Sequence, residues 1–430
     1  MHTPPLLTRR LDNGLLAVAL QRPGDTALLN VDVRVGSRFE SRQDHGLSHF
    51  LEHMIFQGSA SVPAPADVNR RAERMGAAFD AWTARDSSRY SHWLDPKRLP
   101  ESATLLADLL HRPVFSELES ERAIIVEESL DEFDEDGRLV DADTIARRAL
   151  WPKSPLGQNV IGSQENLQRF TRADLQRHHA HFFGARNMVL TVAGPDAPAA
   201  LLDAVAGPFS ALPAGEARTP EPAGAAPLGP VVEQVEDGQS QVEVRLLFRT
   251  PGRHHADAPA LRVLRRALDD GLSARLHRRL GSELGLAYSL WAVWERYSDS
   301  GAFEIGASVS PAKVTAFVEE SQALLRGLAT APPTGDELDH VRFRTAWAAR
   351  CNADQAEGLV SMYGTPHLFE AEPAHPADRL AAALAVTTDE LARVADATFR
   401  PDEHVACFVG PLDKPVRRAL KGRVRAFGRG

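Results

Sequence analysis

Cysteine is nearly absent from this chain of 430 residues, which contains only Cys351 and Cys407. Two thiols cannot form the disulfide framework of a small secreted domain, and Cys407 lies in an apolar run typical of a buried strand. No apolar run approaches the roughly 18 residues of a membrane span. The first residues also lack the apolar stretch of a signal peptide. The sequence therefore predicts a cytoplasmic protein in a reducing compartment.

An excess of positive charge is lacking as well. Lysine and arginine number 49 against 58 acidic residues, which gives a formal net charge of −9. No overall basic field attracts nucleic acid or anionic lipid, so we expect neither a nucleic-acid partner nor a membrane partner. The exception is the C-terminal tail, where a solvated basic end is the ordinary interpretation. Its basic residues are Lys414, Arg417, Arg418, Lys421, Arg423, Arg425 and Arg429.

The organisation of the chain suggests two similar halves. Residues 213–230 are rich in proline, glycine and alanine without periodicity, which is typical of a linker. FGARNMVLTVAGP (183–195) and FRPDEHVACFVGP (399–411) each place a phenylalanine 12 residues before a proline, and VDVRV and VEVRL occupy matching places about 211 residues apart. We therefore predict an α+β fold with an N-terminal half (1–212) and a C-terminal half (231–430). Each half is expected to be a mostly antiparallel sheet with helices packed on it.

A possible metal site lies in the first half, in the segment HFLEHMIFQGS (49–59). On a helix His49 and His53 share a face, so that two imidazoles can bind one ion, and Glu52 borders the same face. Zn²⁺ accepts imidazole nitrogen, and a carboxylate beside its open position can serve as a general base. Two histidines and a glutamate also occur by chance on helix surfaces. Here the rest of the helix is apolar, and burying these groups without a partner costs several kcal/mol, roughly.

A third ligand is expected from the helix predicted at residues 118–133. Glu121 and Glu128 are seven residues apart and lie on one face, whereas Glu127 points about 100° away from Glu128. If that face is buried against the metal helix, Glu128 binds the ion and Glu121 supports it. Spacing alone leaves Glu127 and Glu128 open, and an acidic solvated face is the alternative.

These segments together resemble the inverted zincins of the pitrilysin and insulin-degrading enzyme family, including bacterial processing-peptidase-like proteins. The likeness runs through most of the chain, and it rests on the combination of motifs rather than on H-x-x-E-H alone. Besides 49–59 it includes GAAFDAWTARDSSRYSHWL (76–94), ERAIIVEES (121–129), PLGQNVIGSQENL (155–167), FFGARNMVLTVAGP (182–195) and LDDGLSARLHRRLGSELGLAYSL (268–290). It implies one half of a clam-shell peptidase that cleaves peptides inside a closed chamber.

Carried over residue by residue, the resemblance implies that His49, His53 and Glu128 bind one Zn²⁺ per chain. It implies Glu52 as the general base and Glu121 as a supporting acidic residue. The family's edge strand, which pairs with extended substrate, corresponds to residues 78–83, where the family usually has Asn at the position of Asp80. The substrate-binding residues implied there are Phe79, Asp80, Ala81 and Trp82.

The second half departs from the family pattern at one position. The family carries an arginine and, seven residues later, a tyrosine that bind substrate and stabilise the oxyanion. Tyr288 matches the tyrosine, but the position seven before it is Gly281. Arg278 and Arg279 are close in sequence, yet on a helix they point elsewhere. The resemblance therefore implies a heterodimer in which a homologous partner supplies the pair, with a homodimer that works without the arginine as the alternative.

Two other functions are compatible with these motifs. A non-catalytic structural or assembly subunit of the same fold is one, although such chains usually lose part of the metal motif. A peptide-binding module with structural zinc is the other, although a structural site requires a closed fourth ligand, normally Cys or His. The peptide that is cut, whether a general oligopeptide or a dedicated precursor, is not encoded in these motifs.

Overall fold

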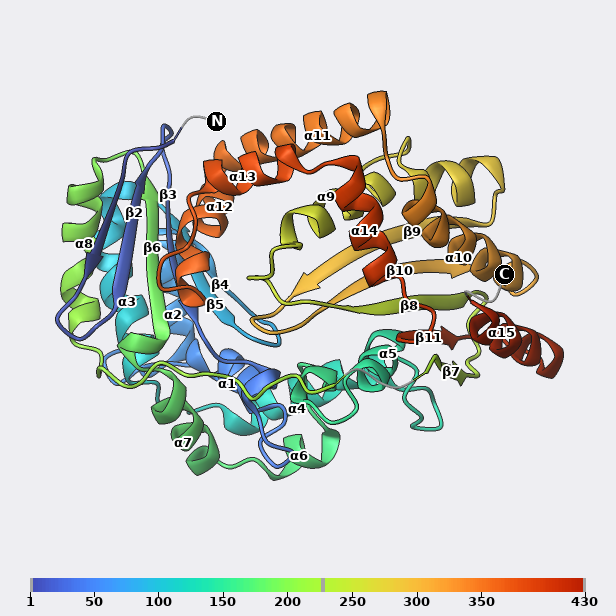
Figure 1. Ribbon diagram of the computed structural model, residues 1–430. Coiled ribbons are helices and arrows are strands. Elements are labelled where there is room, and N and C mark those ends of the chain that lie inside the picture. The colour runs from blue at the N-terminus through green and yellow to red at the C-terminus, as the bar shows by residue number, and fades with distance from the viewer. Residues whose placement is uncertain (1–2, 226–228, 428–430) are drawn as a thin grey trace. The chain divides into compact units, whose positions relative to one another are not determined.

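The computed structural model describes residues 3–225 and 229–427, which form two compact units. The N-terminal unit contains the chain up to Ser129, together with Gln158–Glu221 and Ala349–Ala377. The C-terminal unit contains Leu130–Gly157, Pro222–Ala348 and the chain from Asp378 onward. Each unit is a sheet with helices packed on it (Figure 1). The expected α+β fold of two α/β halves is therefore confirmed.

The N-terminal unit is built on a six-stranded sheet with the order β1-β2-β6-β3-β5-β4. Neighbouring strands are antiparallel except β2 and β6. The strands are β1 (Leu6–Arg10), β2 (Leu16–Gln21), β3 (Ala27–Val33), β4 (Gly76–Thr83), β5 (Ser88–Leu94) and β6 (Met188–Gly194). The helices are α1 (Leu47–Ile55), α2 (Pro65–Glu73), α3 (Leu99–His111), α4 (Leu118–Ser129), α6 (Gln164–Arg169), α7 (Arg172–Phe182) and α8 (Pro198–Ser210).

Both faces of this sheet are covered. Every residue of β3 and of β6 is buried, as expected for central strands with helices on both sides. Helices α3 and α8 pack on one face. The other face carries the segment that contains α12 (Ala356–Leu359) and the short turns that follow it, through a cluster that joins Leu359 and Tyr363 to Val18 and Val189. This covering segment comes from the far end of the chain.

A buried ion pair fastens the covering segment to the sheet. Arg89 donates to Asp32 through Nε at 2.8 Å and to the Thr365 hydroxyl through Nη2 at 2.6 Å. The Thr365 hydroxyl in turn donates to Asp32 at 2.9 Å. Asp32 is buried, so its charge depends on these two donors. At another point the Trp93 indole donates to Glu357 at 3.0 Å.

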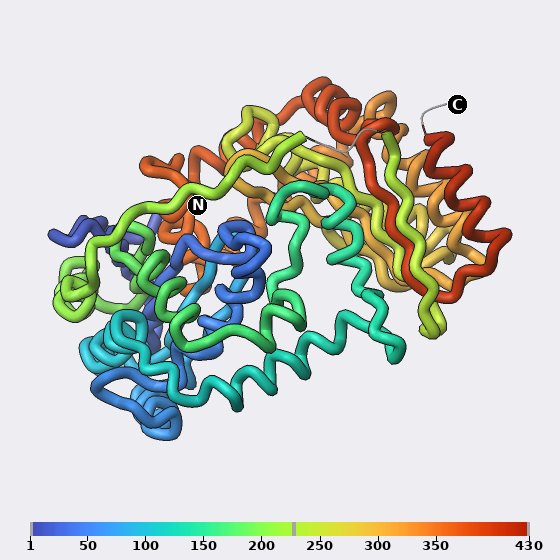
Figure 2. Tube along the Cα trace, turned by 90° about the horizontal axis from the view of Figure 1, so that it is seen from below, coloured from blue at the N-terminus to red at the C-terminus, as the bar shows by residue number. Residues whose placement is uncertain are grey.

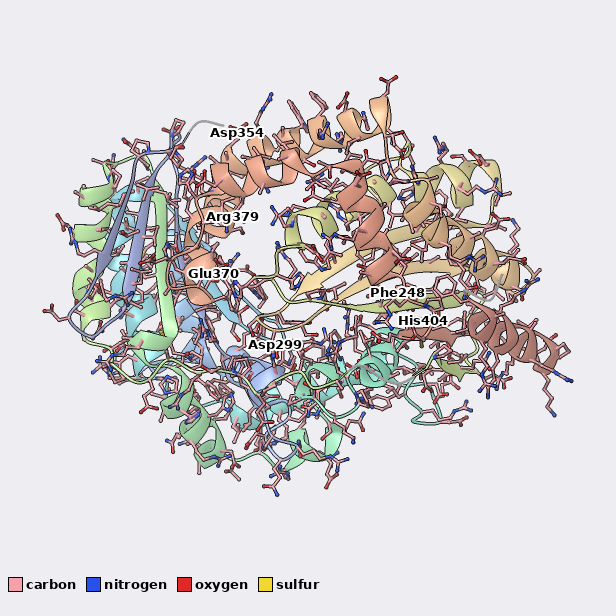
Figure 3. All side chains as sticks on the ribbon, in the orientation of Figure 1. Phe248, Asp299, Asp354, Glu370, Arg379 and His404 are labelled. Atoms are coloured by element: carbon pink, nitrogen blue, oxygen red, sulfur yellow. The ribbon has the colours of Figure 1, made fainter. Side chains whose placement is uncertain are left out.

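The C-terminal unit repeats the same topology with five strands in the order β7-β11-β8-β10-β9. Among its described strands, β7 and β11 form the one parallel pair, which matches β2 with β6. Phe248 of β8 lies beside His404 of β11, with their rings stacked 5.4 Å apart (Figure 3). The strands are β7 (Val231–Val235), β8 (Val242–Thr250), β9 (Ala287–Arg296), β10 (Gly301–Val309) and β11 (His404–Val409). The helices are α5 (Ala142–Leu150), α9 (Ala258–Leu268), α10 (Val314–Thr330), α11 (Gly335–Ala353), α13 (Pro376–Ala385), α14 (Thr388–Thr398) and α15 (Lys414–Ala426); α11 and α13 straddle the unit boundaries.

Helix α5 covers one face of this second sheet, although it belongs to the first half of the sequence. Its apolar side packs on β8 and β11. Its Arg147 is buried and binds Glu295 at 2.6 Å and Glu304 at 2.9 Å. The units are therefore not contiguous, and the predicted boundaries at 1–212 and 231–430 differ from the observed units in residues 130–157 and 349–377. The physical reason is that each sheet has a second apolar face, which a helix from the other half covers.

The local signals of the sequence are otherwise reproduced. The described part of the predicted linker, residues 213–225, has no helix or strand and runs as an extended trace in Figure 2, while residues 226–228 lie outside the described part. The repeat is visible in α7 and α14, which begin with capping boxes at Thr171 and Thr387 and end at Phe183 and Phe399. The basic tail forms α15, and Arg429 lies outside the described residues. No helix among the residues described combines the length and apolar character needed to cross a bilayer.

We expect Asp32→Ala to destabilise the N-terminal unit by about 3–5 kcal/mol, because Arg89 would keep a buried, unpaired charge. In calorimetry this corresponds to a first unfolding transition lowered by about 10 °C. Thr365→Val removes one hydrogen bond and should cost only about 1 kcal/mol. Equal, small effects of both variants would contradict the buried ion pair.

Candidate metal centre

Helix α1 carries the two histidines, and its N-terminus is held by a buried carboxylate. Glu40 accepts hydrogen bonds from the backbone N–H of Gly46 at 2.8 Å and of Ser48 at 2.6 Å, which are otherwise unsatisfied at a helix start. Gly46 has φ of 105°, and a Cβ there would lie 2.7 Å from the carbonyl oxygen of Ile161, so that only glycine fits. The start of the helix is thereby fixed three residues before His49.

The second helix of the site is α4, which lies against α1. Of its residues, Ile125 is buried in the core, and Glu121 is nearly buried. Glu128 is partly exposed and projects to the two histidines. Glu127 is exposed, and no metal-binding group includes it among the described residues. Of the two glutamates that the spacing left open, the structure places Glu128, and not Glu127, beside the two histidines.

Three donor groups from the two helices converge on one point. The Glu128 carboxylate lies 3.7 Å from Nε2 of His49 through Oε1, and 3.7 Å from Nε2 of His53 through Oε2. The potential ligand atoms of these three residues all lie within 4.8 Å of one another, and they are the only such group in the part of the chain that the structure describes. The histidine rings themselves lie 4.8 Å apart at 69°.

Glu121 controls the orientation and the tautomer of His53. Its Oε2 lies 3.1 Å from Nδ1 of His53, and its Oε1 accepts a hydrogen bond of 2.8 Å from Gln57. Because an ionised carboxylate only accepts, Nδ1 must carry the proton. The lone pair of His53 is then on Nε2, on the side of Glu128 and His49. This contact therefore leaves Nε2 of His53 available to bind an ion.

The residues present fit a zinc ion. Two imidazole nitrogens and a carboxylate are the ligand set of catalytic zinc, and ligands around tetrahedral zinc lie roughly 3.3 Å apart. The observed 3.7 Å is too long for a hydrogen bond and close to that separation. Burial, followed by the nearby charge of His53, lowers the pKa of His49 to about 3, so this ring stays neutral as a ligand must. Glu128 is 43% exposed, which leaves one side of the cluster open to solvent.

Glu52 lies beside this cluster in an environment that favours its protonated form. Burial is the main cause that raises its pKa above the ordinary value, and the charges of Glu128 and Asp80 add to the effect. A hydrogen bond from Thr83 and the charge of His53 act in the opposite direction. Its buried Oε2 has no hydrogen-bond partner among the protein atoms described. Such a carboxylate is suited to taking up a proton from a water molecule in the site.

Strand β4 forms the edge of the N-terminal sheet next to α1. It pairs with β5 on one side, and its other edge has no partner strand within the described residues. The Phe79 ring stacks on Phe56 at 5.3 Å, and Ala81 also packs against the core. Asp80 and Trp82 are exposed. At this edge Asp80 and Trp82 are therefore accessible, whereas Phe79 and Ala81 are partly buried.

The residues singled out in the second half belong to the C-terminal unit. Tyr288 lies on the edge strand β9 and is fully exposed. Gly281 lies in a short π-helix, and a Cβ there would meet only ordinary contacts, the nearest 3.6 Å away. Packing therefore does not require glycine at 281. Arg279 binds Glu320 at 2.8 Å, as expected for a side chain directed elsewhere.

Sequence reasoning did not identify three residues that support the site: Glu40, Gln57 and Thr83. Gln57 lies just beyond the end of α1 and donates to Glu121 of α4, a contact between distant segments that no local spacing predicts. Glu40 precedes α1 by several residues, and Thr83 reaches Glu52 from the edge strand. Neither contact has a periodic signature in the sequence.

Comparison with known proteins identifies relatives that cover most of the chain. The family model described as Insulinase (Peptidase family M16) matches residues 16–163, and the model described as Peptidase M16 inactive domain matches residues 169–344. An uncharacterized zinc protease of Mycobacterium leprae is 32% identical over 346 residues, which cover 78% of this chain and 75% of that protein. Cytochrome b-c1 complex subunit 1 of Bos taurus mitochondria is 32% identical over 264 residues, or 60% of this chain and 54% of that protein. The crystal structure of a protease from Helicobacter pylori superposes with a TM-score of 0.87 at 22% identity, over 95% of this chain and 100% of that chain, which shows the fold.

We expect Glu128→Ala to weaken zinc binding by at least about 100-fold, because it removes one of three ligands. Competition with a chromogenic chelator measures this directly. Glu127→Ala removes the neighbouring carboxylate and is the matched control, which should bind zinc as the wild type does. A larger loss in Glu127→Ala than in Glu128→Ala would overturn the ligand assignment.

Proposed function

The chain belongs to peptidase family M16, and from this premise we propose that it is a zinc-dependent endopeptidase subunit that cleaves peptides. The observation that carries the proposal is the convergence of His49, His53 and Glu128, with the buried carboxylate of Glu52 beside them. Relatives named as zinc proteases support zinc as the ion. We assign His49, His53 and Glu128 as its ligands, one ion per chain.

Zinc in this position supplies Lewis acidity, which lowers the pKa of water and polarises a peptide carbonyl. Glu52 takes the proton from the attacking water and passes it to the leaving amine. Its raised pKa makes this carboxylate a better proton acceptor than an ordinary glutamate. Glu121 holds His53 in the required tautomer. Thr83 holds the Glu52 carboxylate at the edge strand, next to the substrate.

An extended peptide binds by adding a strand to the free edge of β4, in this proposal. Backbone hydrogen bonds along β4 then hold peptides of many sequences, and side chains of the strand select among them. The substrate is therefore an unfolded or extended peptide, either a general oligopeptide or one dedicated precursor.

A non-catalytic subunit is the second candidate function, because the chain is also 32% identical to a cytochrome b-c1 complex subunit. Against it stands the complete set of ligands, general base and supporting acid. A structural subunit gains nothing from the buried Glu52, whose Oε2 has no partner. We therefore favour the peptidase.

A homologous partner subunit is the third element of the proposal. In this proposal an arginine–tyrosine pair stabilises the oxyanion, and this chain has Tyr288 but no arginine seven residues before it, at Gly281. We propose that a partner subunit supplies the arginine–tyrosine pair, so that this chain is the catalytic half of a heterodimer. A homodimer that works without the arginine is the competing arrangement. The cytoplasm remains the proposed location.

We expect Glu52→Gln to keep one zinc ion per chain and to lose at least about 10³-fold in kcat, because the amide cannot accept the proton. Zinc content by mass spectrometry and cleavage of a quenched-fluorescent peptide measure the two effects separately. If turnover persists in this variant, Glu52 is not the general base.

We expect the purified chain alone to cleave slowly, and to gain at least about tenfold in kcat/KM with a homologue that carries the arginine–tyrosine pair. The control is the same homologue with its arginine replaced by alanine, which should give no such gain. Full activity of this chain as a homodimer would contradict the heterodimer.

A further inference from the structure

The outward side of the edge strand β4 presents two side chains close together. Asp80 and Trp82 are two residues apart, so they project from the same face of the strand, opposite to Phe79. Asp80 is exposed, and Trp82 keeps 40% of its surface exposed. Along a strand, residues at this spacing lie roughly 7 Å apart. The pair thus combines a carboxylate with an aromatic surface at one edge.

The carboxylate of Asp80 is available to interact with a substrate. Within the described residues it has neither a hydrogen bond nor an ion pair. The cation closest to it in the strand register is Arg89, which pairs with Trp82 across the ladder, and its guanidinium is already bound by Asp32 and Thr365. No charge within this cluster therefore neutralises Asp80.

The other carboxylates around the candidate centre lie at the histidines and are assigned to metal binding or catalysis in the proposed function. Glu128 belongs to the ligand group, Glu121 holds His53, and Glu52 lies beside the ligands. Asp80 lies near enough to Glu52 for its charge to act on that carboxylate. It is also three residues before Thr83, roughly 10 Å along the strand from the residue that touches Glu52. A substrate side chain at Asp80 is thus within about three residues of the scissile bond.

Trp82 supplies the apolar half of the same site. The Arg89 guanidinium lies over its ring at 5.2 Å and holds the indole in place. The exposed part of the ring can pack against a hydrocarbon stem, while Asp80 receives the charge at the end of that stem. Lysine and arginine are the side chains with a long apolar stem and a terminal cation.

We propose that Asp80 and Trp82 form a selectivity site for a lysine or arginine side chain of the peptide, close to the bond that is cut. This inference rests on the proposed peptidase function and names its substrate class as basic peptides. Asp80 determines the preference for charge, and Trp82 determines the preference for a long stem. The attraction to Asp80 is electrostatic and partly exposed, so it weakens with salt.

Matched peptides separate the two contributions. Quenched-fluorescent peptides carry lysine, norleucine or alanine at each of three positions on either side of the scissile bond. Lysine against norleucine isolates the charge, because the stems are alike, and norleucine against alanine isolates the stem. We expect the wild type to prefer lysine over norleucine at one position by about three- to tenfold in kcat/KM at low salt. Asp80→Asn should bring this ratio close to one, and Trp82→Ala should reduce the ratio of norleucine to alanine.

The control variant is Glu73→Gln, which removes an equally exposed negative charge from the same unit, on α2. It should keep the wild-type ratio of lysine to norleucine. A preference for lysine that survives Asp80→Asn, or that is absent from the wild type, would overturn the proposal. An equal loss in Glu73→Gln would also overturn it, because the effect would then follow overall charge.

A binding measurement distinguishes failure of this inference from failure of the peptidase function. In the Glu52→Gln background, fluorescence anisotropy compares the affinities for the lysine and norleucine peptides with and without Asp80→Asn. A lysine preference that depends on Asp80 supports the site even if the wild type cleaves none of the peptides, in which case only the peptidase function fails. If the lysine and norleucine peptides bind with equal affinity both with and without Asp80→Asn, the site is rejected, whatever the cleavage data show.

Discussion

The packing of α4 along the polar side of α1 is the constraint on which the centre depends, because neither helix holds a complete site. Helix α1 offers two histidines and Glu52 on an otherwise buried apolar helix. Helix α4 is anchored by the buried Ile125 and by Arg122, which donates to the carbonyl oxygen of Phe170 at 2.6 Å. Because α4 is held in this position, the seven-residue spacing places Glu128 beside Nε2 of both histidines and Glu121 beside Nδ1 of His53. A rotation of α4 by one residue, about 100°, would turn Glu128 away from the histidines, so that the three side chains would no longer converge.

Each sheet is covered on one face by a segment from the other half of the sequence, and residues of the candidate centre lie next to these segments. Glu128, a member of the candidate metal-binding group, lies two residues before Leu130, where the chain enters the C-terminal unit and then forms α5. Thr365, in the segment that returns to the N-terminal unit, binds the same Arg89 that holds Trp82 on the edge strand. Each sheet depends on a segment from the other half to cover one apolar face. A chain divided at the linker would expose a large apolar face on both pieces, so the halves are not independent folding units.

Much of the N-terminal unit could be predicted from the sequence, because its signals are local. The hairpin of β4 and β5 follows from alternation and turn residues, and α1 follows from its run of apolar residues around the histidines. The i, i+4 histidines and the seven-residue spacing of Glu121 and Glu128 suffice to place the cluster, apart from the choice of Glu127 or Glu128. The exchanged segments could not be predicted, since what covers the second face of a sheet is a matter of tertiary contact. The fully buried strands β3 and β6 were the available hint that both faces are covered.

The relatives alone do not decide between catalysis and a structural role, but the energetic cost of the buried polar groups favours catalysis. Keeping Glu52 buried with a raised pKa and an oxygen without a partner costs stability, and so does the buried Nδ1 of His49, which also lacks a partner among the described atoms. An apolar residue at either position would stabilise a purely structural subunit. Such a cost is maintained where a proton must be moved or an ion bound, since both require polar groups that the protein leaves unsatisfied. The same reasoning applies at Gly281, where packing leaves room for a side chain and none is present. There the missing group costs the fold nothing, which is consistent with an arginine supplied from another subunit.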